Sequence, residues 1–172
     1  AVELSGVLNG KAGSHPDSIV VVKPDQNITF YVKKWLPGTP ENVKQKGVFW
    51  IRQSEDRRKI EYHSGGNERN PALKNPKYIF QIPKELCGDE GFYVEGSLGG
   101  GQDFTKVRNV GLIVRGYTAP KVVTSYWTEK GKGYDNRISS NNPTKYGVDL
   151  HLKLKVYGLN GCDCDVWVYR TL

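Results

Sequence analysis

Two short clusters in the sequence contain the residue types that catalysis or metal binding needs. Residues 162–165, Cys-Asp-Cys-Asp, place two thiols and two carboxylates side by side, a ligand set that suits zinc or copper if His151 or Cys87 lies close. Alternatively, these residues belong to a strand whose inward face takes the cysteines as small apolar side chains. The second interpretation is favoured, because no His-x-His, His-Glu-x-x-His or Cys-x-x-Cys pair is present. We therefore predict no metal site and no cofactor.

The second cluster is Ser-Glu-Asp-Arg-Arg-Lys at residues 54–59. These groups could form an acid-base or phosphate site, but adjacent charges at a hairpin tip usually keep the loop solvated. The glycine-rich residues 96–104 precede no helix that could supply backbone amides to a phosphate. No Gly-x-Ser-x-Gly elbow and no ordered nucleophile, histidine and aspartate are present. We predict no catalytic residue and do not expect an enzyme.

Exposed side chains remain as candidates for binding. Aromatic rings can stack on the apolar faces of sugars, so a carbohydrate-binding or adhesive module is an alternative function. Most aromatic side chains of this sequence, however, are expected to pack in the core or on strand faces. The candidate surface-binding residues are Trp35, Arg57, Arg58 and Tyr134.

The positive charge of the chain is spread along its length. Residues 119–172 carry eight basic and five acidic residues, a net charge of +3, which leaves +4 of the total +7 for residues 1–118. A nucleic-acid-binding surface normally concentrates lysine and arginine along one groove or helix. We therefore expect no nucleic-acid partner. No run of apolar residues is long enough to cross a membrane as a helix, so no membrane span is predicted.

The elements that position these side chains are predicted to be strands. Valine, isoleucine, threonine and aromatic residues in short runs, punctuated by 20 glycines and 9 prolines, are typical of strands joined by tight turns. We expect strand pairs at 18–35, 48–64 and 77–98, followed by a last strand at 106–117. These strands would close a β-sandwich over residues 1–118.

A second β unit is predicted for residues 119–172, after an extended Thr-Ala-Pro linker at 118–120. Residues 148–159 alternate cleanly between apolar and polar side chains and are the clearest strand in the chain. With strands at 121–128 and 162–172, the unit has three strands, too few to bury both faces of a sandwich. Either these strands join the first module, or the natural protein continues past Leu172. The fold class is thus all-β, with the second sandwich incomplete.

Two segments resemble a known group of proteins. Residues 47–53, with a central tryptophan, and residues 78–98, with an Ile-Pro segment before a glycine turn, are similar to immunoglobulin-like modules, although Cys87 stands without the paired cysteine of antibody domains. The Tyr-Trp pair at 126–127, Leu-His-Leu at 150–152 and Gly-Leu-Asn-Gly at 158–161 resemble repeated β-sandwich modules of large Bacteroidota exported or type VI secretion-associated proteins.

The resemblance implies a spacer and carries no catalytic residues with it. We expect a non-enzymatic structural or protein-interaction module of a larger bacterial exported or secretion-system-associated protein. It would be exported, at the cell surface or associated with the secretion system, with the cytoplasm before export as the alternative location. The expected partners are proteins or flanking domains of the same polypeptide, with a glycan as the alternative. A non-catalytic part of a secreted effector or enzyme is a further alternative.

Overall fold

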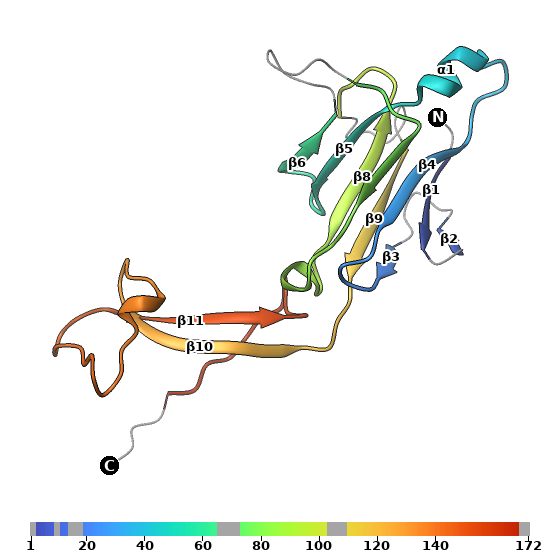
Figure 1. The fold of residues 1–172 in the computed structure, drawn as a ribbon. Coiled ribbons are helices and arrows are strands. Elements are labelled where there is room, and N and C mark those ends of the chain that lie inside the picture. Colours follow the sequence, from blue (N-terminus) through green and yellow to red (C-terminus); the bar gives the residue numbers. More distant parts are fainter. Residues whose placement is uncertain (1–2, 9–10, 14–18, 65–72, 103–109, 169–172) are drawn as a thin grey trace.

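The computed structural model describes residues 3–8, 11–13, 19–64, 73–102 and 110–168. In these residues the chain forms eleven strands and three short helices (Figure 1). The all-β prediction is therefore confirmed at the level of a mainly stranded chain with several sheets. The helices are α1 (Glu41–Lys46), η1 (Lys84–Leu86) and η2 (Tyr134–Asn136).

Two sheets build the larger part of the molecule. The first has the strand order β2-β1-β4-β7, and its neighbouring strands are antiparallel. Its strands are β1 (Glu3–Leu8), β2 (Lys11–Gly13), β4 (Ile28–Lys34) and β7 (Lys77–Phe80). The second has the order β3-β9-β8-β5-β6, in which only the β3–β9 pair is parallel. Its strands are β3 (Ile19–Val22), β5 (Phe49–Ser54), β6 (Ile60–His63), β8 (Phe92–Ser97) and β9 (Val110–Gly116).

A single hydrophobic core joins these two sheets. Phe30 and Phe80 of the first sheet stack with ring centroids 5.6 Å apart, and Trp50 of the second sheet lies 6.5 Å from Phe30. Trp50 is fully buried, and its indole N–H donates to the carbonyl oxygen of Asn75 at 2.9 Å. That bond removes the cost of burying the one polar group of this ring.

The structure corrects two of the predicted strand pairs. The strands predicted within 18–35 are β3 and β4, and those predicted within 77–98 are β7 and β8, but each pair is divided between the two sheets. The reason is that each strand has one apolar face. When the connection between two strands crosses from one sheet to the other, the apolar faces of both strands can pack in the core between the sheets. The pair predicted at 48–64 is confirmed, since β5 and β6 are antiparallel neighbours.

A separate two-stranded sheet extends from one end of the larger part (Figure 1). Its strands are β10 (Lys121–Glu129) and β11 (Leu150–Tyr157), which pair antiparallel. We call them the β10–β11 hairpin. The predicted third strand is not found: residues 162–168 form no strand, and 169–172 lie outside the described residues. Residues 162–168 form no ladder with any described strand, so their backbone groups gain no sheet hydrogen bonds there.

The turn after β11 attaches the hairpin to the larger part. The backbone N–H of Asn160 donates to the carbonyl of Cys87 at 2.9 Å, and its carbonyl accepts from the N–H groups of Asp89 and Glu90 at 2.7 and 3.1 Å. Gly158 packs so closely on the backbone of Thr118 that a β-carbon there would lie 2.4 Å from its carbonyl oxygen. The hairpin is thus held at its base, with its strands extending outward.

None of the helices in the described part of the chain has the length and apolar character needed to span a bilayer.

Candidate functional site

The four predicted surface-binding residues lie on separate elements. Trp35 follows β4 and packs, half-buried, against the core. Arg57 and Arg58 lie in the turn between β5 and β6. Tyr134 begins η2 in the hairpin, where its ring meets Tyr126 edge-on at 5.1 Å. The structure does not bring these side chains together into one site.

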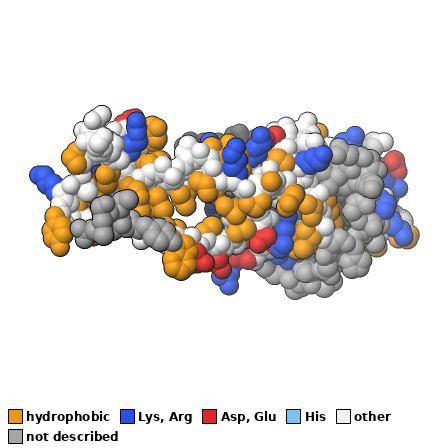
Figure 2. Space-filling model, turned by 90° about the horizontal axis from the view of Figure 1, so that it is seen from below, with side chains coloured by type: hydrophobic (Ala, Val, Ile, Leu, Met, Phe, Trp, Pro, Cys, Tyr) orange, Lys and Arg blue, Asp and Glu red, His pale blue; other side chains and the backbone are white. Residues whose placement is uncertain are grey.

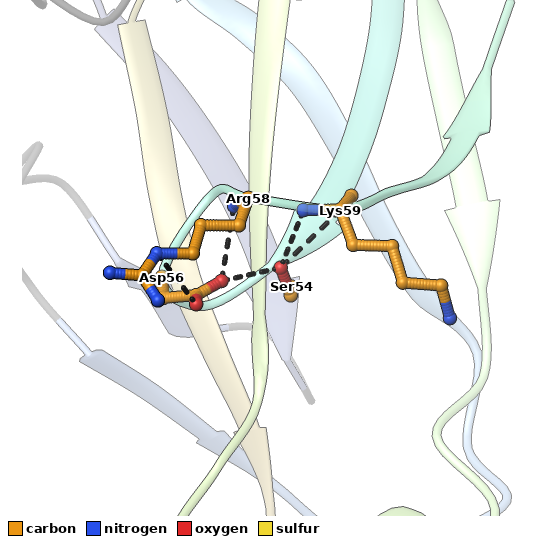
Figure 3. A network of polar contacts seen from close by, with 4 residues as sticks. All are labelled: Ser54, Asp56, Arg58 and Lys59. Atoms are coloured by element: carbon orange, nitrogen blue, oxygen red, sulfur yellow. Dashed lines mark hydrogen bonds and ion pairs between the residues drawn. The ribbon is translucent and has the colours of Figure 1, made fainter.

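The cluster at residues 54–59 builds a turn (Figure 3). The Ser54 hydroxyl donates to Oδ1 of Asp56 at 2.6 Å and accepts from the Lys59 N–H at 3.0 Å, while the Arg58 N–H also donates to Asp56 at 3.0 Å. These bonds lower the pKa of Asp56, the bond from Ser54 having the largest effect. The side chains that resembled an acid-base group therefore satisfy the turn's own backbone.

Arg57 is not a surface side chain, which corrects its prediction as one. Its φ angle of 64° turns the side chain onto the second sheet, where Nη2 donates to Oε2 of Glu95 at 2.9 Å. Its guanidinium also lies 4.4 Å from the ring centroid of Tyr93. Both members of the Arg57–Glu95 pair are buried, with side chains 10% and 0% exposed. No local pattern predicts this contact, because Glu95 lies 38 residues away in the sequence.

Next to this turn is an open pocket of about 580 Å³ with both acidic and basic side chains in its wall. Within it, Arg115 donates from Nε to Oε2 of Glu55 at 2.8 Å and from Nη2 to the other carboxylate oxygen. The N–H of Gly91 donates to the same carboxylate at 2.8 Å. The bond from Arg115 is the main reason that the pKa of Glu55 is lowered. A carboxylate held ionised in this way is a poor proton donor near neutral pH.

The histidines and cysteines do not converge on a metal-ligand set within the residues that the structure covers. Cys162 Sγ lies 3.5 Å from a carboxylate oxygen of Asp89, whereas Cys164 is exposed. Cys87 is a buried free thiol, and its burial raises its pKa. His15, the first histidine, lies outside the described residues.

The leading candidate surface is one face of the β10–β11 hairpin. The register places Leu152 opposite Trp127 and Leu154 opposite Ser125, so these side chains share a face with Leu150. Leu150, Leu154 and Trp127 are 41%, 43% and 36% exposed. The alternation predicted for residues 148–159 is confirmed as a strand, β11, whose apolar side chains are partly exposed. We call the group Val122, Trp127, Leu150, Leu152, Leu154 and Val156 the leucine face.

The opposite face of the hairpin has a different character. Lys153 lies opposite Tyr126, and Lys155 lies opposite Thr124. The loop between the strands folds back on this side, since the N–H of Ile138 donates to the Trp127 carbonyl and the ring of Tyr134 meets Tyr126. The loop therefore adds contacts to the polar face, and it also meets the other face at the strand end, where the Thr144 hydroxyl donates to Glu129, opposite Leu150, at 3.2 Å. Figure 2 shows hydrophobic side chains along the hairpin, next to lysine and arginine.

An exposed apolar face on two strands is a feature that needs a physical reason. A two-stranded sheet is at best marginally stable in water without a third strand or a packed face. Contiguous apolar surface bordered by charges is typical of an interaction site. The sequence contains one signal for this exposed face. The apolar side chains of 148–156 belong to a predicted unit with too few strands to cover them.

No family model matches the chain, and searches of curated proteins and of solved structures found no match either.

Proposed function

We propose that this chain is a non-enzymatic structural and protein-interaction module, in which the two-sheet part holds the β10–β11 hairpin toward a protein partner. The observation that carries the proposal is the exposed leucine face. The anchoring of Asn160 and Gly158 supports it, because a fixed base reduces the conformational entropy that a partner would have to remove on binding.

We further propose that residues 1–118 are an immunoglobulin-like β-sandwich and that 119–172 belong to a second, incomplete unit. The first assignment is supported by two sheets that share one core around Trp50. The second is supported by a hairpin whose apolar face lacks a covering sheet among the described residues. The resemblance of 126–127, 150–152 and 158–161 to modules of exported or secretion-associated proteins supports a place in such a polypeptide.

The protein-interaction proposal is tested by replacing apolar side chains on the leucine face. Leu150→Ser with Leu154→Ser makes this face polar without touching the core. The matched control is Ile79→Ser, because Ile79 on β7 is 55% exposed and lies on neither strand of the hairpin. Tagged proteins are produced in the organism that encodes the chain, and the native mass of the assemblies that contain them is measured.

We expect the unchanged chain and the Ile79→Ser control to migrate in an assembly heavier than one copy, and the double variant to lose that assembly. Circular dichroism and thermal unfolding of the purified double variant establish that the fold is retained. An assembly that survives the double substitution, or a chain that is a lone monomer in the cell, would contradict the proposal.

A further inference from the structure

We propose that the leucine face and the adjacent edge of β11 bind the C-terminal segment 162–168 of a second copy of the chain, which adds to the sheet as an antiparallel strand. This inference rests on the proposed interaction function and names its partner. Exchange of an identical segment between two copies is a common route to a symmetric dimer.

The acceptor is the free edge of β11. Among the described residues β11 pairs only with β10, so its other edge has backbone groups available for another strand. Only the end of this edge is engaged, where the Gly158 N–H approaches the Lys84 carbonyl at 3.4 Å and Lys155 Nζ lies 3.4 Å from Glu85. Because Lys155 takes part through its side chain, the backbone along 150–156 makes no hydrogen bond across this edge to another described segment.

The donor is the segment 162–168, which leaves the turn without joining a sheet. Val166, Trp167 and Val168 are 53%, 78% and 73% exposed. Extended strands in solution gain from backbone pairing along an exposed edge, and their alternate side chains decide which edge they choose. This segment is thus a strand-forming sequence that lacks a partner strand within the described chain.

One antiparallel register matches the two strands residue by residue. With Asp165 opposite Lys153, the next pair of charges, Asp163 and Lys155, also comes together. In the same register the cysteines and valines of the segment fall on the leucine face, whereas Trp167 falls opposite His151 on the other face. The apolar pairs are Cys162 with Val156, Cys164 with Leu154, Val166 with Leu152, and Val168 with Leu150. A parallel alignment that brought the same charges together would place Val168 beyond the end of β11 at Tyr157.

Attachment of the turn favours a second copy over the chain's own segment. Asn160 makes three backbone hydrogen bonds to residues 87–90, and a β-carbon on Gly161 would lie 2.3 Å from the Glu90 side chain. From this fixed turn the segment runs away from β11 and forms no ladder with it. A second copy can offer its segment to the same edge while both turns stay attached, and the exchange is reciprocal.

A disulfide trap tests the register in the purified full chain. Leu154→Cys in a Cys162→Ser background places a new thiol opposite the native Cys164 of the other copy. The matched control is Leu150→Cys in the same background, because residue 150 shares the face of residue 154 but lies four residues from the predicted contact. We expect mild oxidation to give a disulfide-linked dimer with Leu154→Cys and at least about tenfold less with Leu150→Cys.

A disulfide within one chain, seen as an oxidised monomer, would overturn the proposal of a second copy. Equal cross-linking of the two variants would overturn the register and with it the proposal.

A charge exchange tests the same pairing without new thiols. Asp165→Lys puts two lysines opposite each other at both ends of the symmetric dimer, and we expect its dissociation constant to rise at least about tenfold. Adding Lys153→Asp should restore the constant to within about threefold of the original. Sedimentation equilibrium over a range of concentrations measures all three proteins. Equal dissociation constants for the three proteins would contradict the proposal.

The self-association of the purified chain and its assembly in the cell test the second copy and the interaction function separately. A purified chain that stays monomeric at every concentration overturns the second copy as partner. If the same chain still forms a heavier assembly in the cell through the leucine face, the interaction function stands with a different protein as its partner.

Discussion

At the residue scale, charged side chains near the β5–β6 turn serve the fold. Glu55, held by Arg115 and by the N–H of Gly91, joins the turn to β9 and to the start of β8. Its side chain and that of Arg115 are 20% and 31% exposed, so this ion pair is more sheltered than those at the surface.

We expect Glu55→Gln to lower the free energy of unfolding by about 1 kcal/mol at pH 7, because the charge-assisted bonds from Arg115 are lost. The folded pKa of Glu55 is lowered, so its contribution is present above the ordinary glutamate pKa. It is lost as the pH falls through the lowered value. Urea unfolding of both proteins at pH 7 and below about pH 4 should show the difference shrinking with acid.

Arg58→Gln is the control for this measurement, because the Arg58 side chain is 88% exposed and its ion pair with Asp56, at 3.6 Å, lies at the surface. It should leave the unfolding midpoint unchanged. A Glu55→Gln difference that stays constant from neutral to acid pH would contradict the role given to the carboxylate.

Tyr78 provides a second pH test from inside the core. Burial raises its pKa from 10.0 to about 12, so from pH 10 upward the unfolded chain ionises this phenol more readily than the folded chain does. Stability should therefore fall as the pH rises through this range. Between pH 10 and 11 we expect the parent protein to lose about 1 kcal/mol more than Tyr78→Phe does. Equal losses in denaturant unfolding would refute this account.

The charged residues at 54–59 show how far the sequence predicts the site. Their place in a hairpin tip follows from local charge and turn chemistry, and the structure agrees. The burial of Arg57 does not follow, because it depends on a positive φ angle and on Glu95, which a different strand supplies. Local patterns predict a turn, whereas contacts between distant strands decide which of its side chains are exposed.

At the element scale, the β10–β11 hairpin depends on its anchoring turn. Gly158 has φ +69°, and a β-carbon there would meet the Thr118 carbonyl oxygen at 2.4 Å. We expect Gly158→Ala to weaken the attachment of the hairpin to the two-sheet part, at a cost of about 1 to 3 kcal/mol. The Asn160 amide, which donates to Cys87, should then exchange its hydrogen faster.

Gly147→Ala separates the effect of the positive φ angle from the effect of close packing, which are combined at Gly158. Gly147 has a similar φ of +80°, but a β-carbon there would meet nothing within 4 Å. The Gly147→Ala substitution should lower stability only through its unfavourable φ angle. It should leave the hydrogen exchange of the Asn160 amide unchanged. Equal exchange rates at Asn160 in both variants would show that close packing at Gly158 does not hold the hairpin.

The positions of the strands were easier to predict than the pairing between strands. The alternation along 148–159 is a local signal, and it gave β11 correctly. The sheet assignments of β3 and β7 depend on which distant strand completes the hydrogen bonds, here β9 for β3 and β4 for β7. Because the same alternation fits either sheet, the sequence could not decide between a hairpin and a crossing connection.

At the scale of the whole molecule, the described chain consists of a two-sheet part with a buried core and a hairpin without one. Trp50 and Phe30 are almost fully buried in the first, whereas Trp127 and Leu154 are exposed in the second. The hairpin therefore has apolar side chains exposed on one face of its two strands. The proposed role depends on whether that face meets another protein.

Site-specific photo-cross-linking tests this claim most directly. A photoreactive phenylalanine derivative replaces Trp127 on the leucine face or, as the control, Ile79 on β7, and the two proteins are irradiated in the cells that encode the chain. The account predicts a discrete cross-linked protein from position 127 and none from position 79. Position 127 without a cross-linked protein, or the same products from both positions, would contradict the claim that the hairpin is an interaction surface.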